Sequence, residues 1–153
     1  MNQRIWIYTL SQSLSAEQLV DFKNSCDAFV NSWTAHDVKL DASYELYKNR
    51  LLLFKVNEAS YNASGCSIDK QVRFVKDQEQ HLNIELLNRM LVAYEEHDQF
   101  YIVHQSNIKQ LLANGEITEN TIVYNNSITS SLQLENEWKI ALKKSWLVKY
   151  LTK

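Results

Sequence analysis

The chain has 153 residues, the usual size of one globular domain, and 45% hydrophobic with 22% charged residues is the composition of a water-soluble globule. A formal net charge of −2 gives no general attraction to nucleic acid or to an anionic membrane, so we expect no nucleic-acid partner. Because two cysteines are too few for a disulfide framework and no secretory leader or long apolar run is recognisable, we expect one cytoplasmic domain, 1–153, without an integral membrane segment.

The first elements are predicted by residue type and spacing. Residues 4–10 are rich in β-branched and aromatic side chains, which favours a strand. Ser15 and Gln18 have the spacing of a capping box, and apolar residues at helical spacing follow as far as Trp33.

Apolar and polar side chains alternate without interruption over residues 38–47, which predicts a half-exposed strand. Residues 51–56 are apolar on both faces, as in a central strand. Lys48-Asn49 between them is a plausible tight turn, so we expect an antiparallel hairpin. The outer edge of residues 38–47 would allow pairing with a second copy, that is, a homodimer.

The second half is predicted in the same way. A helix should begin near Ser67 and end near Asn83, and a hairpin should join residues 90–94 to 100–104. From Thr129 onward the pattern predicts helix to the end of the chain.

This order of elements predicts an α+β fold. Strand, helix, two strands, helix and two strands are followed by helix, strand and helix. We therefore expect an antiparallel sheet built from hairpins, with helices packed mainly on one face. The order favours a ferredoxin-like (split βαβ) core with a C-terminal αβα extension.

The glycine count excludes several nucleotide sites. Gly65 and Gly115 are the only glycines, 50 positions apart, so the chain has no Walker A loop, no dinucleotide-binding glycine turn and no nucleophile elbow. Zinc-binding CxxC and HExxH patterns are also absent from the sequence. His97 lies in an acidic turn without the ligand spacing of a closed metal site. We expect no metal and no cofactor.

The stretch from Ala63 to Asp69 is the most informative one. It holds one of two glycines and one of two cysteines, in a small-residue turn just before a predicted helix. Backbone N–H groups at a helix start can bind an anion. Five residues form this candidate ligand site together with Trp33 and His36: Ser64, Gly65, Cys66, Ser67 and Asp69.

A covalent role is the alternative for the same turn. A helix N-terminus favours the thiolate of Cys66, and His36, which closely follows Trp33, is the candidate base. The structural alternative is that Gly65-Cys66-Ser67 is merely a tight turn whose small residues fit under a helix. Cys26 lies in an apolar helical stripe, which predicts an inert core thiol.

The C-terminal segment is basic. Residues 139–153 carry five lysines and no acidic residue, interleaved with Trp146 and Tyr150. Such a segment can dock on a membrane or in a partner's groove. Alternatively, it is a terminal helix that docks Leu142, Trp146 and Tyr150 onto the core.

The chain resembles a family of small uncharacterised bacterial proteins commonly labelled "ABC transporter ATPase". The likeness runs along most of the chain, and it is carried by Ile5-Trp6-Ile7-Tyr8, Trp33-x-x-His36, Ser64-Gly65-Cys66-Ser67-Ile68-Asp69, Val72 and Ser145-Trp146. The family usually has glycine where this chain has Asp37. The label implies nucleotide hydrolysis, but without a Walker A glycine pair the residues offer ATP phosphates no known cradle. The resemblance therefore brings no established activity, cofactor or partner.

Three hypotheses follow from the sequence. The first is a small cytoplasmic binding or regulatory protein for a small ligand or a protein partner, without ATPase activity, with its site at residues 64–69, Trp33 and His36. The second is a thiol-dependent enzyme that uses Cys66 as nucleophile and His36 as base. The third is an accessory protein that docks through residues 139–153.

Overall fold

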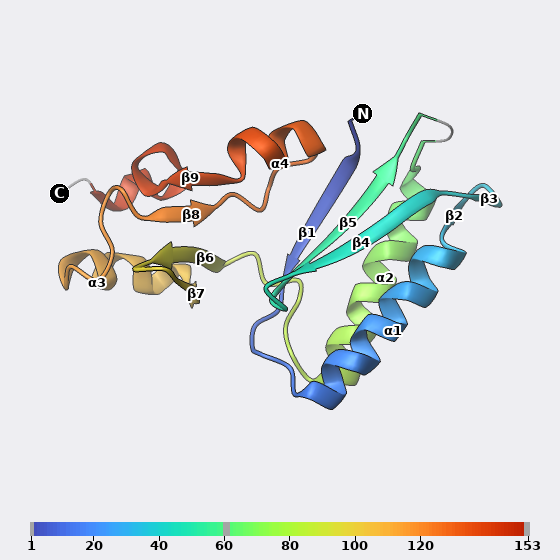
Figure 1. Cartoon of the computed structure of the whole chain (residues 1–153), viewed down its shortest axis with the longest axis horizontal. Coiled ribbons are helices and arrows are strands. Elements are labelled where there is room, and N and C mark those ends of the chain that lie inside the picture. The colour runs from blue at the N-terminus through green and yellow to red at the C-terminus, as the bar shows by residue number, and fades with distance from the viewer. Residues whose placement is uncertain (1, 60–61, 152–153) are drawn as a thin grey trace.

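The structure, a computed structural model, describes residues 2–59 and 62–151. These residues form antiparallel sheets and helices, so the α+β prediction is confirmed (Figure 1). In chain order the strands and helices are β1 (Arg4–Thr9), α1 (Ala16–Ser32), β2 (Thr34–Ala35), β3 (Val38–Lys39), β4 (Asp41–Tyr47), β5 (Leu51–Asn57), α2 (Gly65–Leu82), β6 (Leu91–Glu96), β7 (Gln99–His104), α3 (Ile108–Ala113), β8 (Ile122–Tyr124), α4 (Ser131–Glu137) and β9 (Lys139–Ala141), with 3-10 helices η1 (Gln105–Asn107), η2 (Leu142–Lys144) and η3 (Trp146–Leu151).

The first sheet is a split βαβ unit. Its strand order is β1-β5-β4, and β5 is antiparallel to both neighbours. β1 and β4 are therefore parallel, and α1 makes the crossover between them. In a complete βαββαβ unit a fourth strand follows the second helix and pairs with the free edge of the first strand. Here β6, the strand after α2, instead joins a second sheet of order β7-β6-β8-β9.

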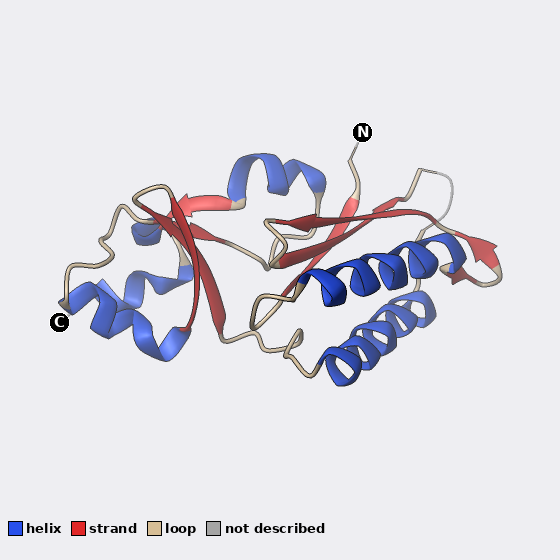
Figure 2. Cartoon of the chain, turned by 60° about the horizontal axis from the view of Figure 1, so that its bottom comes forward, coloured by secondary structure: helices blue, strands red, loops and turns tan. Residues whose placement is uncertain are grey.

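Helices α1 and α2 cover one face of the first sheet (Figure 2). The capping box predicted at Ser15 and Gln18 starts α1. Phe22, Cys26 and Val30 are the buried residues of that helix, and they pack against the sheet. The burial of Cys26 is confirmed, and burial raises the pKa of its thiol to about 12.

The opposite face of the first sheet packs on the second sheet. Ile5, Leu51 and Leu53 share one apolar cluster with Ala93 and Tyr124 of the second sheet. Polar contacts surround the Tyr124 ring of this cluster. The Tyr124 hydroxyl donates to the Glu95 carboxylate, and the Lys139 ammonium lies 5.5 Å from the centre of the ring. Burial is the main cause of the raised pKa of Tyr124.

Among the described residues, backbone hydrogen bonds to the outer edge of the first strand are found at its beginning. The Ile5 N–H donates to the Thr129 carbonyl at 2.9 Å, and the Ser131 N–H donates to the Gln3 carbonyl at 2.9 Å. These two bonds flank an isolated bridge between Arg4 and Ser130. A short piece of the loop before α4 thus occupies part of the place that a fourth strand would take.

Two tight turns have central residues with positive φ, and only one of them was predicted from the sequence. Lys48 and Asn49 have φ of 52° and 58°, which confirms the predicted turn between β4 and β5. His36 and Asp37, with φ of 50° and 65°, form a similar turn that the sequence analysis did not foresee. It joins β2 to β3, and the predicted strand over residues 38–47 is therefore interrupted at Leu40, which belongs to neither β3 nor β4.

The prediction of helix from Thr129 onward is wrong. That part of the chain, as far as it is described, forms α4, β9 and two short 3-10 helices. Leu142 and Leu147 are the buried anchors, whereas Trp146 is 40% exposed. Residues 139–141 instead pair with β8, and Ile140 packs in an apolar cluster with Val92 and Val123 of the same sheet. Lys153 lies outside the described residues.

Candidate functional site

The N-terminus of α2 is capped by its own side chains. The helix begins at Gly65, with Ser64 as N-cap, two residues before the predicted start near Ser67. The Ser67 N–H donates to Ser64 Oγ at 3.3 Å, and the Ser64 N–H donates to Ser67 Oγ at 2.7 Å. This capping box satisfies two of the backbone N–H groups at the helix start, those of Ser64 and Ser67, which are therefore not offered to an anion.

Trp33 is part of the core below this turn. Its side chain is 1% exposed, and its indole Nε1–H donates to the Ser67 carbonyl at 2.8 Å. The structure therefore brings Trp33 and Ser67 together, as the predicted site requires. The contact is a buried structural hydrogen bond that holds the end of α1 against the beginning of α2.

Cys66 and His36 are both on the surface. Cys66 is exposed in the first turn of α2, and His36 is exposed at the tip of the β2–β3 hairpin. The Lys70 ammonium donates to Thr34 Oγ1 at 2.9 Å and fastens that hairpin to α2. Within the described part of the chain, no hydrogen bond joins His36 to Cys66, so their partnership stays a prediction.

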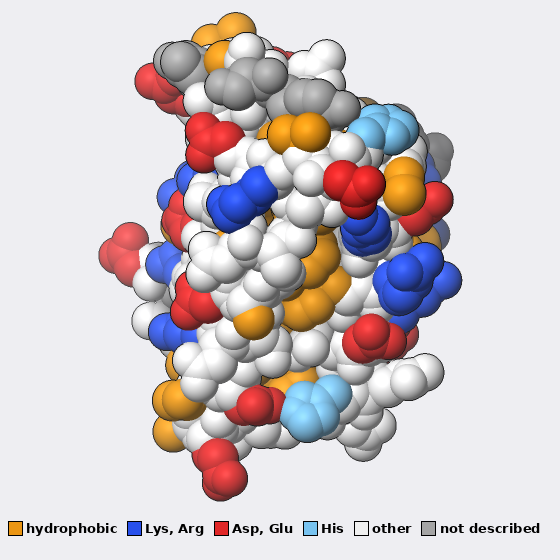
Figure 3. All heavy atoms as spheres, turned by 90° about the vertical axis from the view of Figure 1, so that its right-hand side faces the viewer, with side chains coloured by type: hydrophobic (Ala, Val, Ile, Leu, Met, Phe, Trp, Pro, Cys, Tyr) orange, Lys and Arg blue, Asp and Glu red, His pale blue; other side chains and the backbone are white. Residues whose placement is uncertain are grey.

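Gly65 and Asp69 add little to a binding pocket. A Cβ placed on Gly65 would meet no atom within 4 Å, so no close approach requires a glycine here. Asp69 is exposed in the first turns of the same helix. On the face at this end of the molecule, basic and acidic side chains are interspersed and neither sign dominates (Figure 3).

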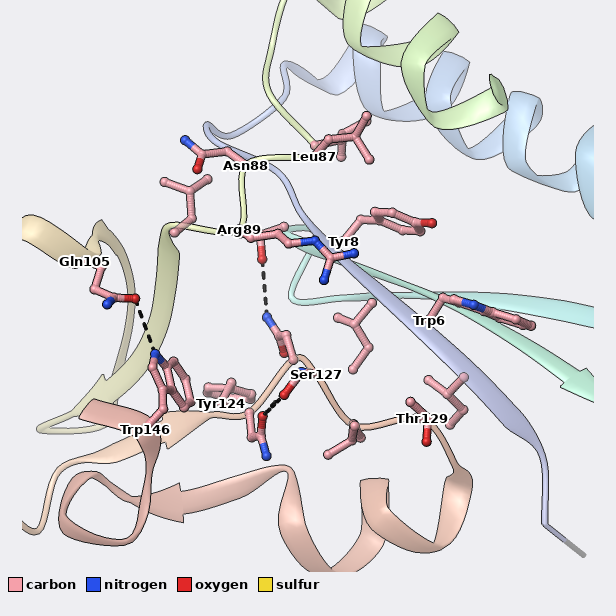
Figure 4. Close-up of a pocket in the computed structure, with 18 residues that line it drawn as sticks. Trp6, Tyr8, Leu87, Asn88, Arg89, Gln105, Tyr124, Ser127, Thr129 and Trp146 are labelled. Atoms are coloured by element: carbon pink, nitrogen blue, oxygen red, sulfur yellow. Dashed lines mark hydrogen bonds between the residues drawn. The ribbon is translucent and has the colours of Figure 1, made fainter. Parts of the chain in front are cut away.

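A cleft of about 470 Å³ lies elsewhere, between β1 and the second half of the chain (Figure 4). None of the seven predicted site residues lines it. Its lining is contributed by β1, the loop before β6, the loop after β8, and single residues of the C-terminal half: Ile5, Trp6, Ile7, Tyr8, Thr9, Leu86, Leu87, Asn88, Arg89, Leu91, Gln105, Tyr124, Asn125, Asn126, Ser127, Ile128, Thr129 and Trp146.

Arg89 is the one charged residue in this lining. The loop that carries it is held by Glu79 of α2, whose carboxylate accepts the Leu86 N–H at 2.7 Å and the Leu87 N–H at 2.9 Å. Figure 4 shows Arg89 extending from that loop toward Tyr8 of β1. Its guanidinium is therefore placed by a fixed loop and is available to an anionic group.

Tyr8 forms the boundary between the cleft and the helices. Its hydroxyl donates to Gln71 Oε1 of α2. Burial raises the pKa of Tyr8 to about 12, against the opposing charge of Arg89. The Tyr8 hydroxyl is therefore uncharged at neutral pH.

Hydrogen bonds between side chains hold the wall opposite β1 in place and link it to the end of that strand. Trp138 Nε1–H donates to Asn126 Oδ1 at 2.8 Å, and Asn126 Nδ2 donates to Thr9 Oγ1 at 3.2 Å. Trp146 Nε1–H donates to Gln105 Oε1 at 3.3 Å, which orients this half-exposed ring at the cleft (Figure 4). The arrangement combines flat apolar surface, fixed amides and one cation, which is typical of a binding site.

Residues 2–59 and 62–151 contain no group of three His, Cys, Asp or Glu side chains placed to hold a metal ion. His104 Nδ1, at the end of β7, lies 2.8 Å from Ser106 Oγ. No helix in these ranges is long and apolar enough to cross a membrane.

Comparison of the chain with family models, with curated proteins and with solved structures finds no match.

Sequence reasoning missed the cleft because its walls come from segments that are far apart in the chain. Of the lining residues, Ile5 to Tyr8 were noted beforehand only as a strand and for the family resemblance, and Trp146 for its place in a basic aromatic segment. Arg89 gave no signal, because a lone arginine in a polar stretch has no recognisable pattern. The missing fourth strand, which creates the cleft, becomes visible only when β6 is seen to join another sheet.

Proposed function

We propose that this protein is a small binding or regulatory protein whose ligand or partner enters the cleft beside β1, and that it does not hydrolyse ATP. The observation that carries the proposal is a cleft of about 470 Å³ with Arg89 as its single charged lining residue. The Trp146 indole adds flat apolar surface, whereas the Trp6 indole packs on the helix side of the sheet, 5.8 Å from the Trp33 ring. These features together suit an anionic group attached to an apolar or planar body.

The C-terminal docking hypothesis becomes part of this proposal. Trp146 belongs to the basic segment and also lines the cleft, so the segment contributes one wall. The cytoplasm, where free thiols are ordinary, is the compartment that suits a chain whose two cysteines are unpaired.

Anilinonaphthalene sulfonate, an aromatic anion, is a suitable probe. Added to the ¹⁵N-labelled protein, it should shift the indole N–H signal of Trp146 and the backbone signal of Arg89. Arg89→Ala should weaken binding of the probe about tenfold, because it removes a charge-assisted hydrogen bond that contributes about 1–2 kcal/mol. Arg73→Ala, an exposed arginine on α2, is the matched control and should bind as the wild type does.

The proposal is wrong if the probe shifts no cleft signal, or if it binds Arg89→Ala and wild type equally well. A rise in thermal stability with ATP would contradict the expected lack of nucleotide binding.

Thiol chemistry at Cys66, with His36 as base, is the second candidate, favoured by the exposure of that side chain. Native-state alkylation with iodoacetamide tests it. A reactive thiolate should label faster than free cysteine at neutral pH, and Cys66→Ser should abolish the labelling. Labelling no faster than free cysteine, or equally fast in His36→Ala, removes this candidate.

A further inference from the structure

The edge of β1 that faces the cleft has unpaired backbone groups. Along a β-strand the N–H and C=O groups of successive residues point to opposite sides. Ile5 donates its N–H away from β5, to Thr129, and Leu10 donates toward the β5 side, to Arg50. Ile7 and Thr9 share the direction of Ile5, and both line the cleft.

No described residue provides a backbone partner for the outward N–H and C=O of Ile7. The backbone of the segment after β8 bonds to Ile5 of β1 and to Gln3, just before that strand. Farther along, the contact is made by side chains, Asn126 to Thr9. Between these two contacts the strand edge is open to whatever fills the cleft, and an open edge is a template for another strand.

We propose that the cleft binds an extended peptide segment of a partner protein, which pairs with β1 at Ile7 and places an acidic side chain against Arg89. The peptide would take the position of the fourth strand that the split βαβ unit lacks. This inference rests on the proposed function, because it names the kind of ligand for the same cleft.

The charge of the cleft and the length of the open strand edge limit which peptides can bind. Since Arg89 is the only charged lining residue, a peptide carboxylate gains a partner and a lysine or arginine side chain is repelled. The open edge between the Thr129 and Asn126 contacts covers Trp6 to Tyr8, about 10 Å at roughly 3.3 Å per residue, so about three peptide residues fit along it. A contact this short gives micromolar or weaker affinity, which suits a regulatory encounter.

The test uses a pool of synthetic heptapeptides, acetylated and amidated so that their ends carry no charge. Peptides that bind the wild type should be enriched in β-branched residues and in Glu or Asp. Arg89→Ala should lose about tenfold in affinity for them, and the control Arg73→Ala none.

The variants Ile7→Pro and Ile7→Ala distinguish the contribution of the Ile7 backbone N–H to peptide binding from that of the Ile7 side chain. Proline at position 7 removes the outward N–H but none of the hydrogen bonds to β5. An edge strand tolerates proline at such a position. We expect Ile7→Pro to lose at least about tenfold in peptide affinity and Ile7→Ala to lose much less.

Amide hydrogen exchange of the wild type decides the question even if Ile7→Pro does not fold. A saturating selected peptide should slow exchange at the Ile7 amide by about tenfold or more. An unchanged Ile7 rate with peptide bound overturns strand pairing. Peptide affinity of Ile7→Pro equal to that of the wild type also overturns it. If raising the protein concentration without peptide slows exchange at Ile7, the occupant is a second copy of the chain and the peptide inference is wrong.

Failure of the two proposals can be told apart. If anilinonaphthalene sulfonate binds the cleft and no peptide does, the cleft is a binding site and the peptide inference is wrong. If neither binds, the proposed function is wrong as well.

Discussion

The N-terminus of α2 and the outer edge of β1 both bring main-chain polar groups to the surface, and they use them differently. At α2, the side chains of Ser64 and Ser67 accept hydrogen bonds from each other's backbone N–H groups. The Trp33 indole N–H donates to the Ser67 carbonyl. At β1, the groups of Ile7 face a cleft and have no such partner in the described chain. Polar groups already satisfied within the fold contribute to stability, whereas unsatisfied ones at a cleft are free to contribute to binding.

Removing the indole of Trp33 should have the largest effect on stability. Trp33→Ala removes a buried ring and leaves the Ser67 carbonyl without its donor, and we expect a loss of about 3–5 kcal/mol in the free energy of unfolding. Trp146→Ala, at a 40% exposed position, should cost about 1 kcal/mol or less and should instead weaken binding of the anionic probe. Urea titration measures both. Equal losses in the two variants would abolish the contrast between the regions.

Alkaline pH should destabilise the fold through the buried groups. The pKa of Cys26 rises from its ordinary 9.0 to about 12, because burial disfavours the thiolate. The unfolded chain therefore loses this proton at a lower pH than the folded chain. The stabilisation is complete below the unfolded value and is lost as pH rises toward the folded one.

The expected slope for Cys26 alone is about 1.4 kcal/mol per pH unit above pH 9. Urea unfolding between about pH 8 and pH 10 should show a shallower decline in Cys26→Ala than in the wild type. The exposed Cys66 offers the control, since Cys66→Ala should keep the wild-type slope. Identical slopes in all three proteins would mean that the buried thiol does not titrate as described.

The serine cap of α2 should have an effect of intermediate size. Ser64→Ala removes the acceptor of the Ser67 N–H and should cost about 1 kcal/mol. Ser64→Asp keeps a capping oxygen and should stay close to wild-type stability. If alanine were as stable as wild type, the capping box would not be what holds this turn.

Gly65 should be replaceable, which sharpens the view that the turn is no ligand cradle. Gly65→Ala places a methyl group in open space at the start of a helix and should stabilise the protein by about 0.5–1 kcal/mol. Gly115→Ala, at φ of 74°, should instead destabilise it by about 1 kcal/mol. Thermal melts of the two variants should move in opposite directions, and a shared direction would contradict the backbone argument.

The smallest effect on stability is expected at the cleft itself. Arg89→Ala should change the free energy of unfolding by about 0.5 kcal/mol or less, because the side chain is exposed and makes no described ion pair. A loss of 2 kcal/mol or more (about the cost of breaking a buried charge pair) would show that Arg89 supports the fold instead of a ligand.

Local patterns in the sequence predicted local structure well. The capping box at Ser15, the turn at Lys48-Asn49 and the buried stripe containing Cys26 are each set by neighbouring residues, and all three are present. The C-terminal segment was mispredicted because β9 depends on a distant partner, β8, which no spacing rule contains.

The candidate site divides in the same way. The small-residue turn at Ser64 to Asp69 was found because its residues are contiguous, although much of its polar capacity is used by capping. The cleft was not found because it results from β6 leaving the first sheet. That event is decided by packing of the second half of the chain.

Amide hydrogen exchange of the free protein tests the central claim most directly, namely that β1 is unpaired where it faces the cleft. We predict that the Ile7 amide exchanges far faster than the amides of Trp6 and Tyr8, which face β5, and faster than that of Ile5, which donates to Thr129. Protection of Ile7 equal to that of Trp6 in dilute protein without ligand would mean that the edge is already occupied, and would contradict the account.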